Sequence, residues 1–348
     1  MKNFWAELPQ PFFVLAPLAN VTDAAFRRII ATYSKPAGPA VMYTEFVSAD
    51  GLCLAGEEGR TKLMKDLLYS EIERPIVAQF FTATPEHMEK VARLAEDMGF
   101  DGVDINMGCP DKSIEKQGAG AKLILNPERA QELIAAAKRG APNLPVSVKT
   151  RLGYNKDILD EWLPELLKAE PVAVAIHART RKEMSAVPAH WERIKRAVEI
   201  RNELKSRTLI IGNGDVKDIA EAKQKVQETG ADGVMLGRAI FGTPWLFSAK
   251  DSRFGEMNGS PTPPQESFAS IKFRLVALVE HTKLFEELLG DIPGRSGKNF
   301  AIMKKHFKAY AEGFDGAKEL RVKLMETQNA AEVEMVINNF LDGILETL

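Results

Sequence analysis

The chain has 348 residues, of which 45% are hydrophobic, so it can fill a large buried core. This length suggests about two domains, one of which can be a full-size barrel. The formal net charge of −2 means that any nucleic-acid site must be a local patch and not a property of the whole surface. The two cysteines, Cys53 and Cys109, do not suggest a disulfide framework, and no Cys/His cluster has zinc-binding spacing, so we expect no metal.

The first residues carry an early acid followed by prolines instead of the long apolar core of a signal peptide. No apolar run reaches the length of a membrane span. We therefore expect a cytoplasmic protein that does not insert into a membrane.

Short β-rich runs alternate with helical patterns from the N-terminus to about Trp245. The predicted strands are 12–16, 41–44, 76–81, 102–106, 146–151, 172–178, 208–212 and 233–236. The predicted helices are 22–33, 85–98, 127–138, 158–168, 191–204 and 218–229, and three of them begin with signals at Asp23, Pro85 and Pro127. Eight mostly buried strands predict an α/β fold, a closed (β/α)8 TIM barrel. An open doubly wound sheet is the alternative, but it normally has fewer strands.

This alternation breaks at a turn- and proline-rich stretch, residues 251–264, which we interpret as a linker. Only helical patterns follow it, for example at 268–289, 298–311 and 330–345. We therefore predict a barrel domain at 1–250 and a smaller all-helical C-terminal domain at 265–348.

A single cysteine stands at the end of the predicted strand 102–106. Gly108 and Pro110 flank Cys109 and stop the strand, which fixes the local backbone around the thiol. In barrels of this kind the chemistry takes place at the C-terminal ends of the strands. The alternative is that Cys109 is a small buried thiol that fills the core.

Polar or flexible residues recur at the same end of the other strands. They are Pro17, Leu18, Ala19 and Asn20 after the first strand, Gln79 in the third, Lys149 and Arg151 in the fifth, His177 and Arg179 at the sixth, Asn213, Gly214 and Asp215 at the seventh, and Gly237 and Arg238 at the eighth. A lone Gln or Lys could be an edge residue that reaches water, but that reading does not explain the recurrence. The pattern predicts a pocket at the barrel mouth.

The last two strand ends have the composition of a phosphate site. Glycine-rich turns after strands seven and eight let backbone N–H groups approach an anion, and Arg238 can add a charge-assisted hydrogen bond. Either turn alone could be an ordinary loop, but the two together favour a ligand site.

Lys149 is a cation that is costly to bury unless it faces an anion. A reduced flavin carries negative charge at one edge of its ring, and Gln79 could hydrogen-bond to that ring. The alternative is a structural ion pair between Lys149 and Asp104.

Six segments in this order resemble the tRNA-dihydrouridine synthases: APLANVTD (16–23), DINMGCP (104–110), KQGAG (116–120), SVKTRLG (147–153), IGNGD (211–215) and DGVMLGR (232–238). The resemblance runs from about Phe12 to Phe247 and more weakly through 299–325. It implies a flavin-binding barrel with a helical RNA-binding domain. It also implies that FMN is held by Pro17, Leu18, Ala19, Gln79, Lys149, His177, Asn213, Gly214, Asp215, Gly237 and Arg238.

The resemblance further implies that the uracil 5,6 double bond of a uridine in tRNA or another structured RNA is reduced to 5,6-dihydrouridine. NADPH would reduce FMN, a hydride would go to C6, and Cys109 would protonate C5. A thiol with an ordinary pKa of ~8.5 is mostly protonated at neutral pH and still acidic enough for this step. Asn106 would bond to the uracil edge, and Arg179 is a further substrate-side candidate.

The sequence departs from the family in three places. Asn20 stands where a glycine is usual, Ala178 follows His177 where a glycine is common, and the loop 183–191 lacks the usual tyrosine or glycine. The altered loop leaves the choice of substrate open.

A basic segment lies in the predicted helical domain. The segment from Arg295 to Lys323 contains eight basic residues and only three acidic ones. Lys298, Lys305 and Lys308 lie on the side of a helix opposite to an apolar stripe made of Phe300, Met303, Phe307, Tyr310 and Phe314. Such a lysine face is often only solvated, but beside a flavin barrel it favours binding to RNA phosphates.

Three other functions are compatible with parts of this pattern. A related flavin barrel could reduce free pyrimidines or other enones, although the basic helical segment would then have no role. A flavin-free RNA-binding protein could use the same scaffold. An aldolase-type barrel could use Lys149 as a Schiff base, but Cys109 and Gln79 would then have no function. We expect the chain to be a monomer.

Overall fold

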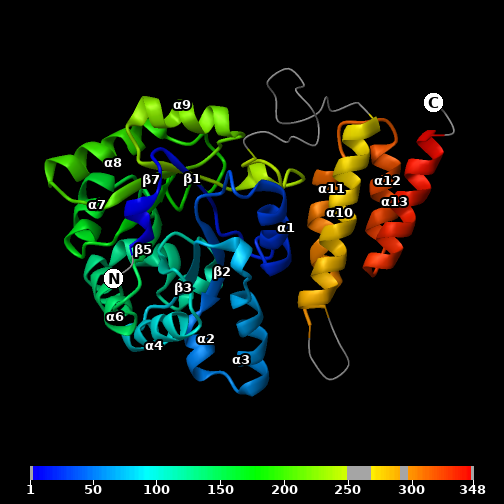
Figure 1. The fold of residues 1–348 in the computed structure, drawn as a ribbon. Helices are drawn as coiled ribbons and strands as arrows, with labels where there is room; N and C mark the ends of the chain where they lie inside the picture. Colours follow the sequence, from blue (N-terminus) through cyan, green and yellow to red (C-terminus); the bar gives the residue numbers. More distant parts are fainter. Residues whose placement is uncertain (1–2, 249–267, 291–296, 346–348) are drawn as a thin grey trace. The chain divides into compact units, whose positions relative to one another are not determined.

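The computed structural model describes residues 3–248, 268–290 and 297–345 (Figure 1). Its described residues contain one sheet of eight parallel strands: β1 (Phe12–Leu15), β2 (Met42–Ser48), β3 (Ile76–Phe81), β4 (Gly102–Asn106), β5 (Val146–Arg151), β6 (Ala173–His177), β7 (Leu209–Asn213) and β8 (Gly233–Leu236). Neighbouring strands follow one another in the sequence, and β1 pairs with β8. A parallel bridge between Val14 and Val41 joins β1 to the start of β2, so the sheet closes on itself. The predicted (β/α)8 barrel is confirmed.

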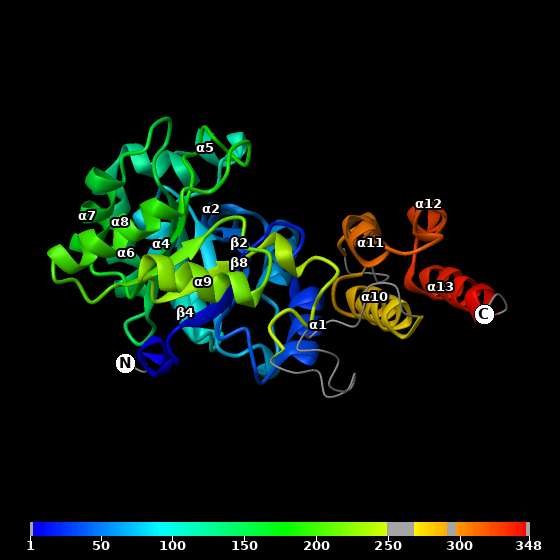
Figure 2. The same cartoon turned by 90° about the horizontal axis from the view of Figure 1, so that it is seen from above.

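Helices follow the strands and surround the barrel (Figure 2). The helices after β3 to β7 are α4 (Pro85–Asp97), α6 (Pro127–Gly140), α7 (Leu159–Lys168), α8 (Trp191–Glu203) and α9 (Ile219–Thr229). The predicted start signals Pro85 and Pro127 are the first residues of α4 and α6. The structure adds side-chain caps: Asn126 accepts a hydrogen bond from the Arg129 N–H ahead of α6, and Asp218 accepts one from the Glu221 N–H ahead of α9. These five helices are confirmed to within one or two residues.

The segment after β2 differs from the prediction. The predicted strand was 41–44, but β2 continues to Ser48 through Glu45, whose side chain is only 4% exposed. Two unpredicted helices follow, α2 (Ala49–Leu54) and α3 (Glu57–Met64). A third, α5 (Lys112–Lys116), lies in the loop after β4.

The interior of the barrel changes from apolar to polar along the strands. Trp5, in the short helix η1 (Phe4–Glu7), packs in one cluster with Phe12, Val14, Ala173 and other strand side chains. Farther along the strands, β3, β4 and β5 place Gln79, Asp104 and Ser147 side by side in register, and all three are buried. Apolar packing at one end thus leaves the other end free for polar chemistry.

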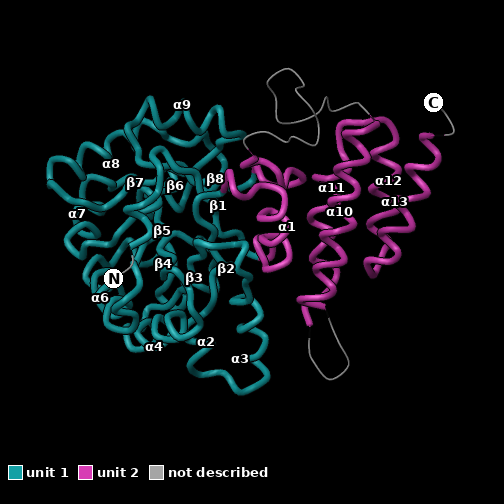
Figure 3. The backbone as a smooth tube through the Cα atoms, viewed as in Figure 1, with its two compact units in different colours: residues 1–19, 39–238 teal, residues 20–38, 239–348 magenta. Residues whose placement is uncertain are grey.

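The chain divides into two compact units (Figure 3). Unit 1 contains residues 1–19 and 39–238, which include the whole barrel sheet. Unit 2 contains residues 20–38 and 239–348, with helices α1 (Ala24–Ser34), α10 (Phe268–Leu289), α11 (Lys304–Tyr310), α12 (Ala317–Glu326) and α13 (Ala330–Leu345).

Helix α1 belongs to unit 2 because its side chains pack against α10. The Phe26 ring stacks on His281 with centroids 4.7 Å apart, and the Tyr33 hydroxyl donates to Glu280 at 2.7 Å. The unit boundaries therefore follow packing and differ from a division at one point of the sequence. The predicted linker 251–264 lies outside the described residues, and the predicted domain limits remain predictions.

No helix among the described residues is long and apolar enough to cross a membrane. The same part of the chain contains no group of three or more His, Cys, Asp or Glu side chains arranged to hold a metal ion.

Candidate active site

A cavity of about 330 Å³ opens at the C-terminal ends of the barrel strands. It is lined by all but one of the barrel residues that the sequence predicts for the site: Pro17, Leu18, Ala19, Asn106, Cys109, Lys149, His177, Arg179, Asn213, Gly214, Asp215, Gly237 and Arg238. The exception is Gln79. The strand ends therefore bring together residues that are up to 221 positions apart in the sequence, from Pro17 to Arg238.

The turn that carries Cys109 is fixed from two sides. The Asn106 side-chain oxygen accepts the backbone N–H groups of Gly108 at 3.1 Å and Cys109 at 2.9 Å. The Cys109 carbonyl accepts the Ala121 N–H at 2.9 Å. Gly120 has φ +60, and a Cβ there would lie 2.7 Å from the Cys109 carbonyl oxygen, so the glycine-rich loop must pass without a side chain.

Cys109 is held as a thiol. Burial raises the pKa of the Cys109 thiol above its ordinary value, while the nearby cations Arg151 and Lys149 oppose this shift. The side chain is half-buried and lines the cavity. At neutral pH the sulfur therefore carries a proton that it can give to a group in the cavity.

Lys149 has no carboxylate partner within ion-pair distance among the described residues. The two oxygens of Asp104 instead accept hydrogen bonds from Gln79 at 2.6 Å and Ser147 at 2.6 Å. Burial, followed by the charge of Arg151, lowers the pKa of Lys149 to about 8. Lys149 is thus a desolvated cation in the cavity wall, not half of a structural ion pair with Asp104.

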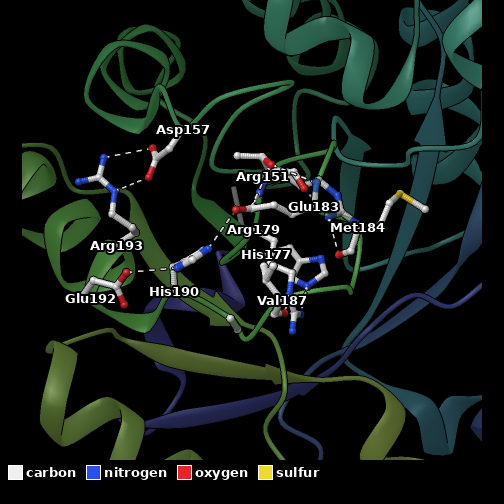
Figure 4. Close-up of polar contacts among 12 residues, drawn as sticks. Arg151, Asp157, His177, Arg179, Glu183, Met184, Val187, His190, Glu192 and Arg193 are labelled. Carbon is white, nitrogen blue, oxygen red and sulfur yellow. Dashed lines mark hydrogen bonds and ion pairs between the residues drawn. The ribbon is translucent and has the colours of Figure 1, made fainter.

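Arg151 connects two loops at the cavity (Figure 4). Its guanidinium donates to the Gly108 carbonyl at 2.7 Å and to the Thr180 carbonyl at 3.1 Å. The side chain is 8% exposed, and burial lowers its pKa to about 10. In the sequence, Arg151 stands at a strand end without a pattern that assigns it a role. The structure places it as the link between the Cys109 turn and the loop after β6.

The loop after β6 is held by a second set of contacts (Figure 4). Glu183 accepts hydrogen bonds from the Thr180 backbone N–H at 2.7 Å and from the Thr180 hydroxyl at 3.0 Å, and it lies 3.1 Å from His190. Arg181 forms an ion pair with Glu115 of α5. The loop that departs from the family pattern is therefore tied to the Cys109 loop.

Two turns at β7 and β8 form the opposite wall. The backbone N–H groups of Gly214, Asp215, Gly237 and Arg238 donate to no backbone carbonyl in the described part of the chain. Gly214 has φ +133, and a Cβ there would lie 2.8 Å from the Ala189 Cβ. At Gly214 and Gly237 this wall offers backbone donors without a side chain in the way, which suits an anion.

His177 and Arg179 are ordered by one another and by Asp215. Burial and then the charge of Arg151 hold the pKa of His177 far below its usual range, so the imidazole is neutral. Its Nε2 lies 3.1 Å from an Arg179 nitrogen, which can only donate, so the His177 proton is on Nδ1. Asp215 pairs with Arg179 and, at 2.7 Å, with Arg238. Both arginines are thus held in the wall by one carboxylate.

The remaining predicted residues lie elsewhere. Gln79 is fully buried behind Asn106 and does not line the cavity. Lys305 and Lys308 are exposed on α11 of unit 2, where Phe307 and Tyr310 are buried, as is Met303 just before this helix. The predicted helix 298–311 is instead the short helix η6 (Phe300–Met303) followed by α11, so Phe300 and Phe314, the two ends of the predicted apolar stripe, lie outside α11 and are only half-buried. Lys298 is half-buried just before η6.

Some lining residues were missed. Phe46 lines the cavity, but the predicted strand ended at Thr44, before it. Ser185 belongs to the loop after β6, whose sequence has no regular period. Val216 and Met235 are ordinary apolar residues with no signal of function. If the predicted strand had been extended through Glu45, the alternation of its side chains between the two faces of the sheet would have indicated Phe46 as a lining residue.

The whole chain can be compared with known proteins. The sequence model of the family described as "Dihydrouridine synthase (Dus)" matches residues 14–345. The chain belongs to this family. A protein of Staphylococcus epidermidis named "Probable tRNA-dihydrouridine synthase" is 39% identical over 340 residues, which are 97% of this chain and 96% of the relative. A Bacillus subtilis protein named "Probable tRNA-dihydrouridine synthase 2" is 38% identical over 348 residues, with 99% of each chain covered.

Among solved structures, morphinone reductase in complex with tetrahydroNAD matches this dihydrouridine synthase family member with a TM-score of 0.48 and 13% identity, over 75% of this chain and 92% of the other. A likeness of that size supports no inference about function. The family assignment rests on the sequence matches.

Proposed function

We propose that this protein reduces uridine to 5,6-dihydrouridine in tRNA, with FMN as its cofactor and NADPH as the electron donor. The observation that carries the proposal is the protonated thiol of Cys109 in the wall of a cavity whose other walls present cations and backbone donors. Membership of the dihydrouridine synthase family and two relatives named for tRNA support the same reaction.

The donor set fits FMN. Lys149 is a half-buried cation in the cavity wall without a carboxylate partner among the described residues, which suits the negative edge of a reduced flavin ring. The backbone N–H groups at Gly214, Asp215, Gly237 and Arg238 suit its phosphate. The turn of Pro17, Leu18 and Ala19 and the His177 and Asn213 side chains would complete the site. FMN bound here supplies hydride transfer from NADPH to the uracil ring, which the protein side chains cannot perform.

Cys109 supplies the proton. As C6 of the uracil gains a hydride, C5 takes the proton from the thiol, and the electron pair of the S–H bond stays on sulfur as a thiolate. The positive charges of Arg151 and Lys149 stabilise that thiolate. Solvent then returns a proton to the sulfur, because the pKa of the thiol is raised. A hydroxyl at this position would be a far weaker acid.

Asn106 and Arg179 are the proposed substrate-side residues of the barrel. One N–H of the Asn106 amide goes to Gln79, and the second can donate to a uracil carbonyl. Arg179 already donates to the Val187 carbonyl at 2.6 Å and pairs with Asp215, so its role is to shape the wall next to the base. In unit 2, Lys298, Lys305 and Lys308 would contact RNA phosphates.

The test uses the purified protein, NADPH and a tRNA transcript that lacks modifications. We expect the protein to carry flavin absorbance, and each modified uridine to gain the mass of two hydrogens. A parallel reaction with free uridine and uracil distinguishes the rival flavin reductase of small pyrimidines. Turnover of free pyrimidines without any product in tRNA, or a purified protein that binds no flavin, contradicts the proposal.

A further inference from the structure

Three buried side chains form a line beneath the turn that carries Cys109. The Gln79 amide nitrogen donates to Asp104 at 2.6 Å, and the Asn106 amide nitrogen donates to the Gln79 oxygen at 3.0 Å. Asp104 and Gln79 have no exposed surface, and neither lines the cavity. None of these contacts is a step of the proposed reaction.

The hydrogen bonds of this line have only one consistent direction. The backbone N–H groups of Gly108 and Cys109 can only donate, so Asn106 must turn its oxygen toward them. The Asn106 nitrogen then faces Gln79, which must present its oxygen. The Gln79 nitrogen is left to face position 104, where only an acceptor can end the line.

A carboxylate at position 104 is an acceptor whose burial costs free energy, because its charge is removed from water. Asp104 is fully buried, in register with Gln79 on one side and Ser147 on the other. Burial raises its pKa to about 6, although hydrogen bonds from Ser147 and Gln79 and the charge of Lys149 oppose the shift. An apolar residue would avoid this cost but could not receive the Gln79 nitrogen.

We propose that Asp104 is a positioning residue that acts through Gln79 to fix the orientation of the Asn106 amide and thereby the turn that holds Cys109. The inference rests on the proposed function, since it concerns the loop of the proposed acid. Its test is chosen so that the network can be measured without RNA.

The first variant is Asp104→Leu, made in a Cys53→Ser background so that Cys109 is the only thiol. Leucine is used instead of asparagine because the Ser147 hydroxyl could accept from an asparagine NH2 while the asparagine oxygen still accepted from Gln79. A leucine at position 104 offers no acceptor, so the Gln79 nitrogen loses its partner and the Gln79 oxygen is no longer fixed toward Asn106. The Asn106 amide can then turn, and the two backbone N–H groups lose a fixed acceptor. We expect alkylation of Cys109 by iodoacetamide to become about tenfold faster, because two hydrogen bonds that hold the turn are lost. We expect kcat for uridine reduction to fall while KM for tRNA stays near its original value.

The second variant, Gln79→Glu with Asp104→Asn, should rescue the turn. The new carboxylate at position 79 accepts from the new amide at position 104 and from Asn106. Asn106 therefore keeps its orientation, and the alkylation rate should return to within about twofold of the starting protein. Because the total charge of the pair is unchanged, this variant also controls for the loss of a buried carboxylate.

The matched control is Asp101→Asn, which neutralises a carboxylate just before the same strand. Asp101 accepts from the Ile76 N–H at 2.8 Å and pairs with Arg74, at the opposite end of β4 from Cys109. Its alkylation rate should match that of the starting protein.

An unchanged alkylation rate in Asp104→Leu overturns the inference. So does a double variant that is alkylated as fast as the single variant, or one that does not fold, since the moved carboxylate satisfies every donor in the line. If the alkylation pattern holds but the starting protein forms no dihydrouridine, the proposed function fails and the positioning network stands.

Discussion

Lys149 is a single side chain whose charge changes within the range of ordinary buffers. Burial and the charge of Arg151 lower its pKa to about 8, against the attraction of Asp104. The side chain is therefore a cation below about pH 8 and neutral above it. We expect FMN to bind the flavin-free protein more weakly as the pH rises through 8, by about tenfold or more for the loss of a charge-assisted hydrogen bond. Quenching of flavin fluorescence measures this affinity.

Two variants separate the Lys149 charge from other pH effects. Lys149→Met should bind FMN weakly at every pH, and Lys149→Arg should bind it without a change near pH 8, because arginine stays charged. A pH dependence that survives in Lys149→Met would assign the titration to another group.

Single residues also show what the sequence could and could not predict. Cys109 and Lys149 could be found because glycines, a proline and a strand end surround them. The role of Asp104 and Gln79 could not, because they are 25 positions apart and meet only through the register of β3 and β4. Nor does the sequence show that Asp215 holds both Arg179 and Arg238, since that depends on how two turns meet.

At the scale of an element, the glycine-rich loop after β4 contains two glycines that look alike in the sequence. Gly118 has φ +77 and Gly120 has φ +60, so both disfavour a side chain. A Cβ at Gly118 would lie 3.3 Å from the Ala83 Cβ, whereas one at Gly120 would lie 2.7 Å from the Cys109 carbonyl oxygen. A side chain at position 120 would therefore clash with the backbone of the proposed acid, Cys109, whereas a side chain at position 118 would not.

We expect Gly118→Ala to lower the free energy of unfolding by about 1 kcal/mol and Gly120→Ala to lower it by about 2 kcal/mol or more, because the second adds a backbone clash to the same strain. Urea unfolding measures both changes. Gly120→Ala should also impair uridine reduction more than its stability loss explains, and Gly118→Ala should not. Equal effects of the two variants on activity would show that the loop does not position Cys109.

Elements were easier to predict than their packing. Helix α1 begins after the Asp23 cap, as its sequence indicates, but nothing in residues 22–33 says that it packs with α10. This packing depends on the contact of Phe26 with His281 and the hydrogen bond of Tyr33 to Glu280, and both partners lie more than 200 positions later in the sequence. Helices α2 and α3 were missed because they are short and follow a strand that extends beyond its first charged residue.

On the scale of the whole molecule, unit 2 contains a buried pair of histidines that limits the pH range of its stability. His281 and His306 lie with ring centroids 4.6 Å apart, among Phe26, Phe241 and Tyr310. Burial holds the pKa of His281 well below its usual range and lowers that of His306 to about 3. The charge of Lys305 adds to the shift of His306.

Both rings are neutral in the folded chain, whereas in the unfolded chain they take up protons below about pH 6.5. The unfolded state then binds more protons, so the stability of unit 2 is present above about pH 6.5 and is lost as the pH falls. Each histidine contributes a slope of about 1.4 kcal/mol per pH unit in the acid range. Hydrogen exchange of the α10 and α11 amides at a series of pH values measures this loss.

The variant His306→Phe should remove about half of that slope, because one of the two titrating rings is gone and the aromatic packing is kept. His190→Gln, at a partly exposed position of unit 1, is the control and should leave the slope of unit 2 unchanged. If the stability of unit 2 in His306→Phe changes with pH as steeply as in the unaltered protein, groups other than these histidines cause the acid sensitivity.

We propose that the Cys109 thiol protonates C5 of a uridine in tRNA. This role is tested by comparing Cys109→Ala with the unaltered protein in two assays, bleaching of flavin absorbance by NADPH and formation of dihydrouridine in a tRNA transcript. We predict that the variant is reduced by NADPH at the original rate but forms dihydrouridine at least about a hundredfold more slowly. Dihydrouridine formation at the original rate in Cys109→Ala would contradict the account.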